Sequence, residues 1–118
     1  VMENINQEEN IKLIQGLIKK QKEQLWLKAF EENGDEFIDF LKNYKDENGN
    51  NVINLMLMET IKNPEIINVI TELTKHVSLL NSDENGLLPS QSAEKKNNFY
   101  LYNFLKNKET LEESLINV

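Results

Sequence analysis

The chain has 118 residues, of which 39% are hydrophobic and 28% charged, a composition typical of one globular domain and not of a disordered chain. Its 13 basic residues, all lysine, stand against 20 acidic ones and give a formal net charge of −7, the wrong sign for neutralising phosphate. We therefore expect neither a nucleic-acid nor a membrane partner. The absence of cysteine excludes disulfides, thiol nucleophiles and thiolate metal sites.

Apolar residues recur at helical spacing along the first third of the chain, which predicts three short helices. The first begins near Gln7, because Asn6 and Glu9 have the spacing of a capping box. The second covers 23–32 and ends at Asn33-Gly34, since glycine tolerates a left-handed backbone. The third covers 35–44 and is expected to bury Phe37, Ile38, Phe40 and Leu41.

The remainder of the chain also predicts helices, over 51–62, 64–75, 89–95, 98–106 and 109–117. The segment 51–62 is apolar nearly all round, which indicates a helix packed between neighbours. Its longest apolar stretch, Val52 to Met58, is too short to cross a bilayer. No segment shows the alternation of a strand, so the predicted class is all-α.

A repeated tetrapeptide is the most informative motif. Asp46-Glu47-Asn48-Gly49 recurs as Asp83-Glu84-Asn85-Gly86, 37 residues later, and each copy precedes a predicted helix pair. Asp and Asn side chains bond nearby backbone amides, and glycine adopts angles that other residues resist. The spacing therefore predicts a structural repeat that begins with a turn.

These residues resemble the ankyrin repeat, which has a period of about 33 and a Thr-Pro-Leu-His-x-Ala helix start. Gly86, Pro89 and Ala93 keep the family spacing, whereas Leu88, Ser90 and Gln91 replace its threonine, leucine and histidine. In the preceding copy, residues 51–54 stand at the tetrapeptide and Met56 replaces the alanine. The segment 25–34 resembles a first copy without its turn. In the copy with Gly86, loss of the threonine and histidine is expected to remove bonds that tie neighbouring turns.

The resemblance implies one domain over 1–118, a short ankyrin-like helical solenoid of helix-turn-helix repeats with capping helices at both ends. The repeats are expected at 23–45, 46–82 and 83–108, the N-terminal cap at 7–22 and the C-terminal cap at 109–118. The alternative is a helical bundle without repeats, in which the two turns are coincidental.

Several polar groups have patterns that resemble chemical sites. Asn81, Asp83 and Asn85 resemble the start of a calcium loop, but Ser92 stands where a glutamate ligand is needed, so we interpret the segment as a helix-capping turn. His76 is the only histidine and is interpreted as a cation at a helix end. The carboxylate pairs are interpreted as solvated faces: Glu8-Glu9, Glu31-Glu32 and Glu112-Glu113. We predict no catalytic residue, cofactor or metal site, and hence no enzymatic activity.

The aromatic residues are interpreted mainly as core instead of a peptide groove: Trp26, Phe30, Phe37, Phe40, Phe99 and Tyr102. Tyr44 and Tyr100 are expected to be the exposed pair.

The resemblance implies binding through the turn tips and the first helices. The predicted partner-binding residues are Lys28, Glu32, Asp46, Glu47, Asn48, Asn50, Asp83, Glu84, Asn85 and Leu87. We expect a non-catalytic protein–protein interaction module whose partner has a basic surface, with oligomeric state left open. By analogy with ankyrin modules of intracellular bacteria and large viruses, it could be a host-directed effector or regulator of an intracellular microbe or virus. The expected location is the cytoplasm, or a host cell into which the protein is delivered without a signal peptide. The alternatives are a targeting or assembly domain of a larger protein, or a helical-bundle adaptor.

Overall fold

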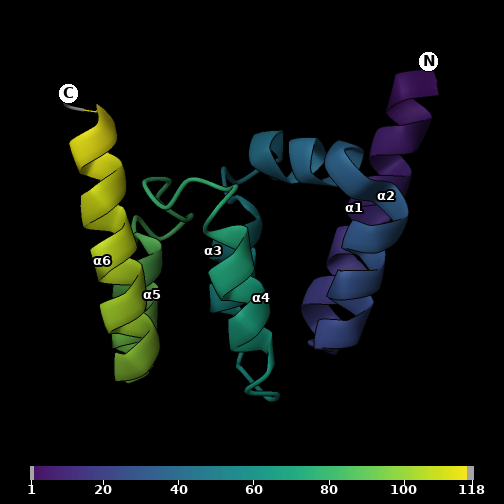
Figure 1. Cartoon of the computed structure of the whole chain (residues 1–118). Coiled ribbons are helices and arrows are strands. Elements are labelled where there is room, and N and C mark those ends of the chain that lie inside the picture. Colours follow the sequence, from purple (N-terminus) through teal and green to yellow (C-terminus); the bar gives the residue numbers. More distant parts are fainter. Residues whose placement is uncertain (1, 117–118) are drawn as a thin grey trace.

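The computed structural model describes residues 2–116, in which every regular element is a helix (Figure 1). The six helices are α1 (Met2–Lys20), α2 (Glu23–Asn43), α3 (Val52–Met58), α4 (Ile66–Leu73), α5 (Pro89–Lys95) and α6 (Phe99–Ile116). The predicted all-α class is thus confirmed over the described residues.

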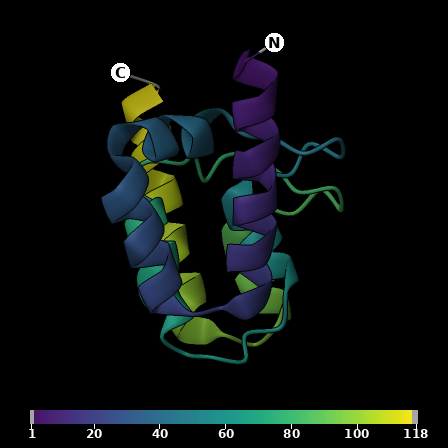
Figure 2. The same ribbon diagram turned by 90° about the vertical axis from the view of Figure 1, so that its right-hand side faces the viewer.

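The helices are arranged as three neighbouring pairs, each made of helices consecutive in the chain (Figure 1). Helix α3 contacts both α1 and α5, so these three form one row, while α2 contacts α4 on the other side. In Figure 2 the three helix pairs lie one behind another. The turns around residues 46–49 and 83–86 project together from the side of α1. The fold therefore places two turns, far apart in sequence, at one edge.

Helix α2 contains an elbow that divides it into two arms. Gly34 has φ 53° and ψ −137°, outside the helical region, and the second arm runs across the end of the first (Figure 1). The predicted break at Asn33-Gly34 is confirmed, because only glycine takes such angles at little cost. The second arm buries Phe37 and Leu41, as predicted, but leaves Ile38 and Phe40 only half-buried.

A single apolar core connects the pairs. Helix α3 is enclosed almost completely, as its composition predicted, and Val52 and Ile53 are fully buried. The largest fully buried apolar side chains come from every helix except α5: Ile14, Trp26, Phe37, Leu41, Ile53, Leu57, Ile70, Leu73, Leu101 and Leu105, together with Leu79 from the loop after α4. Burial of these side chains is the main stabilising contribution to such a fold.

Two predicted helix boundaries are wrong at the ends of the chain. Helix α1 runs from Met2, so Asn6 lies within the helix and not at its start. Helix α6 is continuous from Phe99 to Ile116, so no break separates 98–106 from 109–117. No glycine or proline interrupts α6, and Leu101, Leu105 and Glu109 share one buried stripe. The predicted division at 108/109, with a separate cap over 109–118, therefore falls within one helix.

The segment 7–22, predicted to be an N-terminal cap, belongs to α1 and to the short joint that follows it. Helix α1 contacts both α2 and α3. The predicted repeat 23–45 coincides with α2, whose elbow sets its two arms across each other.

Two long side chains connect the loops that join the helices within each pair. Gln21 Nε2 donates to the Thr60 carbonyl at 2.7 Å, and Gln21 Oε1 accepts from the Lys62 backbone N–H at 2.8 Å. Lys96 Nζ donates to the carbonyls of Leu57 and Glu59. Helix α3 ends at Met58 and not at the predicted residue 62. Burial lowers the pKa of Lys96, against an opposing effect of Glu59.

Candidate functional site

The first turn is closed by Asp46. Its backbone N–H donates to the Asn50 carbonyl at 2.9 Å, and the Gly49 N–H donates to the Asp46 carbonyl at 3.1 Å. Asp46 Oδ1 also accepts from the backbone N–H groups of Asn48 and Asn50, each at 2.9 Å. Gly49 has φ 83°. One carboxylate therefore fixes the backbone of the whole turn, as aspartate commonly does in this position.

The second turn repeats this geometry. The Asp83 N–H donates to the Leu87 carbonyl at 2.9 Å, and Asp83 Oδ1 accepts from the N–H groups of Asn85 and Leu87 at 2.8 and 3.0 Å. Gly86 has φ 77°. The doubled tetrapeptide therefore forms the same turn twice.

Asn50 links the two turns. Its side-chain Nδ2 donates to Asp46 Oδ2 and to Glu84 Oε1, both at 3.0 Å, and its Oδ1 accepts from the Glu84 N–H at 2.8 Å. Asn81 adds a further bond from Nδ2 to the Gly49 carbonyl at 2.9 Å. These bonds explain why the turns lie together in Figure 2. We call residues 46–50 and 83–87 the linked turns.

The linked turns carry negative charge on their outer side. Burial by itself raises the pKa of the Asp46 carboxyl, but bonds from the Asn50 amide and from the backbone amides of Asn50, Asn48 and Gly49 outweigh it and hold that pKa below its usual range. Glu47 and Glu84 are both exposed, as are Asn48 and Asn85.

The structure divides the predicted turn residues into two groups. Glu47, Asn48, Glu84 and Asn85 lie on the surface, and Asp46 and Leu87 are partly exposed. Asn50 is 0% exposed and Asp83 is also buried. The prediction that these last two side chains contact a partner is therefore wrong, because both are used inside and between the turns.

Lys28 and Glu32 lie away from the linked turns. Both are exposed on the first arm of α2 and form an ion pair at 3.8 Å. They border a shallow groove together with Lys12 and Lys20 of α1. The structure does not bring them into one site with the turns.

Two asparagines cap the start of α3 and tie it to the loop after α4. The backbone N–H of Asn51 donates to Asn54 Oδ1 at 2.9 Å, and that of Asn54 donates to Asn51 Oδ1 at 3.0 Å, which forms a reciprocal cap. Asn51 Nδ2 also reaches the Ser78 carbonyl at 3.0 Å, and Asn54 Nδ2 reaches that of Asn81 at 3.1 Å. In this copy asparagine supplies both the cap and the tie to the next unit.

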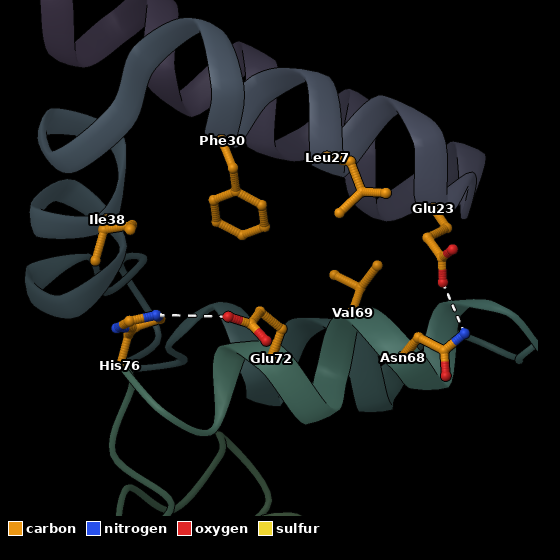
Figure 3. A pocket seen from close by; sticks show the side chains of 8 residues that line it. All are labelled: Glu23, Leu27, Phe30, Ile38, Asn68, Val69, Glu72 and His76. Carbon is orange, nitrogen blue, oxygen red and sulfur yellow. Dashed lines mark hydrogen bonds and ion pairs between the residues drawn. The ribbon is translucent and has the colours of Figure 1, made fainter.

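A second concave feature lies between α2 and α4 (Figure 3). It has a volume of about 470 Å³ and is lined by Glu23, Leu27 and Phe30 of the first arm, Ile38 of the second arm, Asn68, Val69 and Glu72 of α4, and His76. We call it the elbow groove. Figure 3 shows Leu27 and Phe30 extending from α2 toward Val69 and Glu72.

None of the elbow groove's polar residues was predicted to form a site, although His76 was interpreted as a helix-end cation. A signal was present: Glu23, Leu27 and Phe30 follow the i, i+4, i+7 spacing of one helix face, just before the Asn33-Gly34 break. His76 follows α4, and its Nε2 lies 4.0 Å from Glu72 Oε1 at the rim of the groove.

The aromatic predictions are correct in part. Trp26 and Phe37 belong to the core, and Tyr100 is 74% exposed. Phe99, predicted to be core, is 61% exposed at the first residue of α6. Tyr44, predicted to be exposed, is half-buried with its ring 5.4 Å from that of Phe40. Burial, followed by the Asp46 charge, raises the pKa of Tyr44.

Two glutamates of α6 have structural roles that sequence reasoning missed. Glu109 is 1% exposed and accepts from the Ser90 N–H at 2.8 Å and from Ser90 Oγ at 2.7 Å, so it caps the start of α5. Glu112 accepts from the Leu79 N–H at 2.9 Å and from Ser78 Oγ. The interpretation of Glu112 as a solvated side chain is therefore wrong, because it fixes the loop after α4. Glu8, Glu9, Glu31, Glu32 and Glu113 are exposed, as predicted.

Among the side chains that the structure describes, no group of three or more His, Asp or Glu residues is placed to hold a metal ion. Over the same part of the chain, no helix has the length and apolar character needed to cross a membrane.

Comparisons with protein-family models, with curated proteins and with solved structures found no match to this chain.

Proposed function

We propose that the chain is a non-catalytic protein-interaction module that binds a basic surface of a partner protein through the linked turns. The observation that carries this proposal is the pair of bonds between Asn50 and Glu84, which joins two acidic turns into one projecting unit. Glu47 and Glu84 are exposed on that unit.

The bonding of the turns favours recognition because it lowers the entropic cost of binding. Side chains and loops that become ordered on association oppose it, at about 0.5–1.5 kcal/mol for each immobilised side chain. Here Asp46 and Asp83 already hold the backbone of both turns before any partner arrives. A partner would need to order only the outer side chains.

The proposed architecture is an ankyrin-like helical solenoid. Three features support it: the helix pairs lie side by side, the same turn recurs after 37 residues, and Asn51 and Asn54 make the capping and inter-unit bonds expected of a helix start in such a repeat. In solenoids each unit contacts mainly its neighbours and presents an extended surface for binding.

The chemistry of the partner follows from charge. Exposed carboxylates on an acidic chain attract lysine and arginine, speed association and weaken it at high salt. We therefore expect a partner with a cluster of basic residues and a complex whose affinity falls as salt rises.

The test begins with crosslinking in lysate and mass spectrometry to identify a partner, followed by affinity measurements with the purified pair. Reversal of both outer charges, Glu47→Lys with Glu84→Lys, should weaken binding about tenfold, since rim charge pairs contribute about 0.2–1 kcal/mol each. The control reverses two exposed carboxylates elsewhere, Glu31→Lys with Glu113→Lys.

The control variant should retain its affinity within about twofold, because its charges lie outside the linked turns. Because Glu84 also bonds Asn50, Glu47→Lys alone is measured as well and should account for part of the loss. Equal affinity of the turn variant and the wild type would contradict the proposal.

A further inference from the structure

The elbow groove exposes apolar side chains in a concave site. Leu27 is 53% exposed, and Phe30 and Ile38 are half-buried on the two arms of α2. Val69, from the buried face of α4, closes the opposite wall (Figure 3). Scattered apolar residues on a surface are ordinary, but several that converge in one groove mark a site of interaction.

The walls of the elbow groove are fixed by the core behind them. The Phe30 ring lies 6.3 Å from that of Trp26 and 5.5 Å from that of Phe37, and both of these residues are buried. The angle between the arms is set by Gly34. The groove is therefore formed before any ligand binds, which is the usual state of a recognition site.

The spacing of the lining residues suits a short helix. Glu23, Leu27 and Phe30 span two turns of α2, about 10 Å at 1.5 Å per residue. On the other side, Asn68 and Glu72 lie one turn apart on α4. Two facing stripes of this length match an amphipathic helix that presents residues at i, i+4 and i+7.

Carboxylates stand along both stripes of the elbow groove. Glu23 Oε2 accepts from Asn68 Nδ2 at 2.7 Å, which holds that carboxylate at the rim. Glu72 lies 3.1 Å from Lys75 Nζ, and 4.0 Å from His76, through its two oxygens. Ion pairs as exposed as the one with Lys75 are weak, so a partner's cation can compete for Glu72.

We propose that the elbow groove binds a short basic amphipathic helix of a partner protein. Apolar side chains of that helix would contact Leu27, Phe30 and Ile38, and its lysines or arginines would pair with Glu23 and Glu72. Arginine suits both positions because its guanidinium binds a carboxylate through two bonds. Charge argues for a foreign helix over a second copy, because this chain has no arginine and a net charge of −7. The groove is separate from the linked turns, so the inference adds a second surface to the proposed function and rests on it only in assuming a protein partner.

The experiment uses the whole chain and two synthetic helical peptides of about twelve residues. They share one leucine stripe and differ in carrying arginine or glutamate at the flanking positions. Titration followed by backbone amide NMR should give saturable shifts at Leu27, Phe30 and Val69 with the arginine peptide. The glutamate peptide should bind at least about tenfold more weakly, since two attractive charge contacts become repulsive.

Three variants locate the binding. Leu27→Glu should abolish the arginine-peptide shifts, while Leu111→Glu, at a leucine that is 56% exposed on α6, should leave them unchanged. Glu23→Lys with Glu72→Lys should reverse the preference, so that the glutamate peptide binds better. Glu47→Lys with Glu84→Lys should leave peptide affinity unchanged, which separates this surface from the linked turns. Circular dichroism melting shows whether each variant is folded. If Leu27→Glu does not fold, the peptide preference of the Glu23→Lys, Glu72→Lys variant tests the proposal instead.

Four results would overturn the proposal. The first is a set of shifts that map outside the elbow groove, and the second is equal affinity for the two peptides. The third is binding of the arginine peptide to the Leu27→Glu variant as tightly as to the wild type. The fourth is concentration-dependent self-association that covers the groove and excludes the peptides. The last result would assign the groove to a second copy of the chain.

Discussion

The two turns of this protein contain the same tetrapeptide and the same backbone bonds, yet they differ in the residue that follows. Asn50 follows the first turn, is fully buried, and donates to both Asp46 and Glu84. Leu87 follows the second turn and is partly exposed, and there the carboxylate Oδ2 of Asp83 accepts from Ser92 Oγ at 3.3 Å. The tetrapeptide therefore determines the shape of a turn, and the fifth residue determines whether it is linked to a neighbour.

Exchanging the fifth residue gives the largest expected effect. Asn50→Leu gives the first turn the residue of the second, and it removes two donated bonds and one accepted bond at a buried position. We expect the free energy of unfolding to fall by about 2 kcal/mol, because buried hydrogen-bonding groups that lose their partners cost about 1–3 kcal/mol. Chemical denaturation measures this change.

The reverse exchange is the matched control. Leu87→Asn places asparagine where no third turn follows among the described residues, so its cost should stay within about 0.5 kcal/mol, as for an ordinary surface substitution. Equal destabilisation by the two variants would show that Asn50 does not act as a link.

The next largest effect is expected at the glycine that both turns share. Gly49 and Gly86 have φ values of 83° and 77°, and a Cβ added at either would meet no atom within 4 Å. Alanine at each position should therefore cost only backbone strain, about 1 kcal/mol, and should cost the same in both turns. Asparagine, which tolerates positive φ better, should cost less at both.

Thermal unfolding of Gly49→Ala, Gly86→Ala and the two asparagine variants tests this equivalence. A difference above about 0.5 kcal/mol between the alanine variants would exceed ordinary surface variation and show that the turns are not structurally equivalent.

Much of this fold is visible in local sequence signals. The doubled tetrapeptide predicted two like turns, Asn33-Gly34 predicted the elbow, and Pro89 marked the start of α5 at its observed residue. Each of these features depends on backbone preferences within a few residues. The apolar pattern of α3 predicted its enclosure for a similar reason, since a helix without a polar face must be covered.

The remaining features depend on contacts between distant residues. Nothing near Asn50 indicated that its amide would be buried against Glu84, which is 34 residues away. Gln21 and Lys96 tie joints whose partners lie about forty residues away, and Glu109 caps a helix that belongs to an earlier segment. Local patterns predict an exposed acidic turn, and only the packed structure shows which of its polar side chains are already used.

The smallest expected effect is that of Asn50 on the pKa of Asp46 in the first turn. Burial raises the pKa of Asp46, but bonds from Asn50 and its neighbours outweigh this effect and hold that pKa below its ordinary value of 3.8. A carboxyl whose pKa is lowered on folding adds stability above its unfolded pKa and loses it as pH falls through the folded pKa. The contribution should stay below about 1 kcal/mol, because Asp46 is partly exposed to solvent.

Denaturation from pH 7 down to pH 2 should therefore show a stability difference between the wild type and Asp46→Asn that is constant above about pH 5 and shrinks below about pH 4. In the Asn50→Leu background, the same comparison should shrink less with acid, because the side-chain bond that lowers the pKa is gone. If the acid dependence is identical in both backgrounds, the backbone amides of Asn48, Gly49 and residue 50 alone stabilise the carboxylate. The two turns would then differ only in the link to the neighbouring turn, and not in the charge at their base.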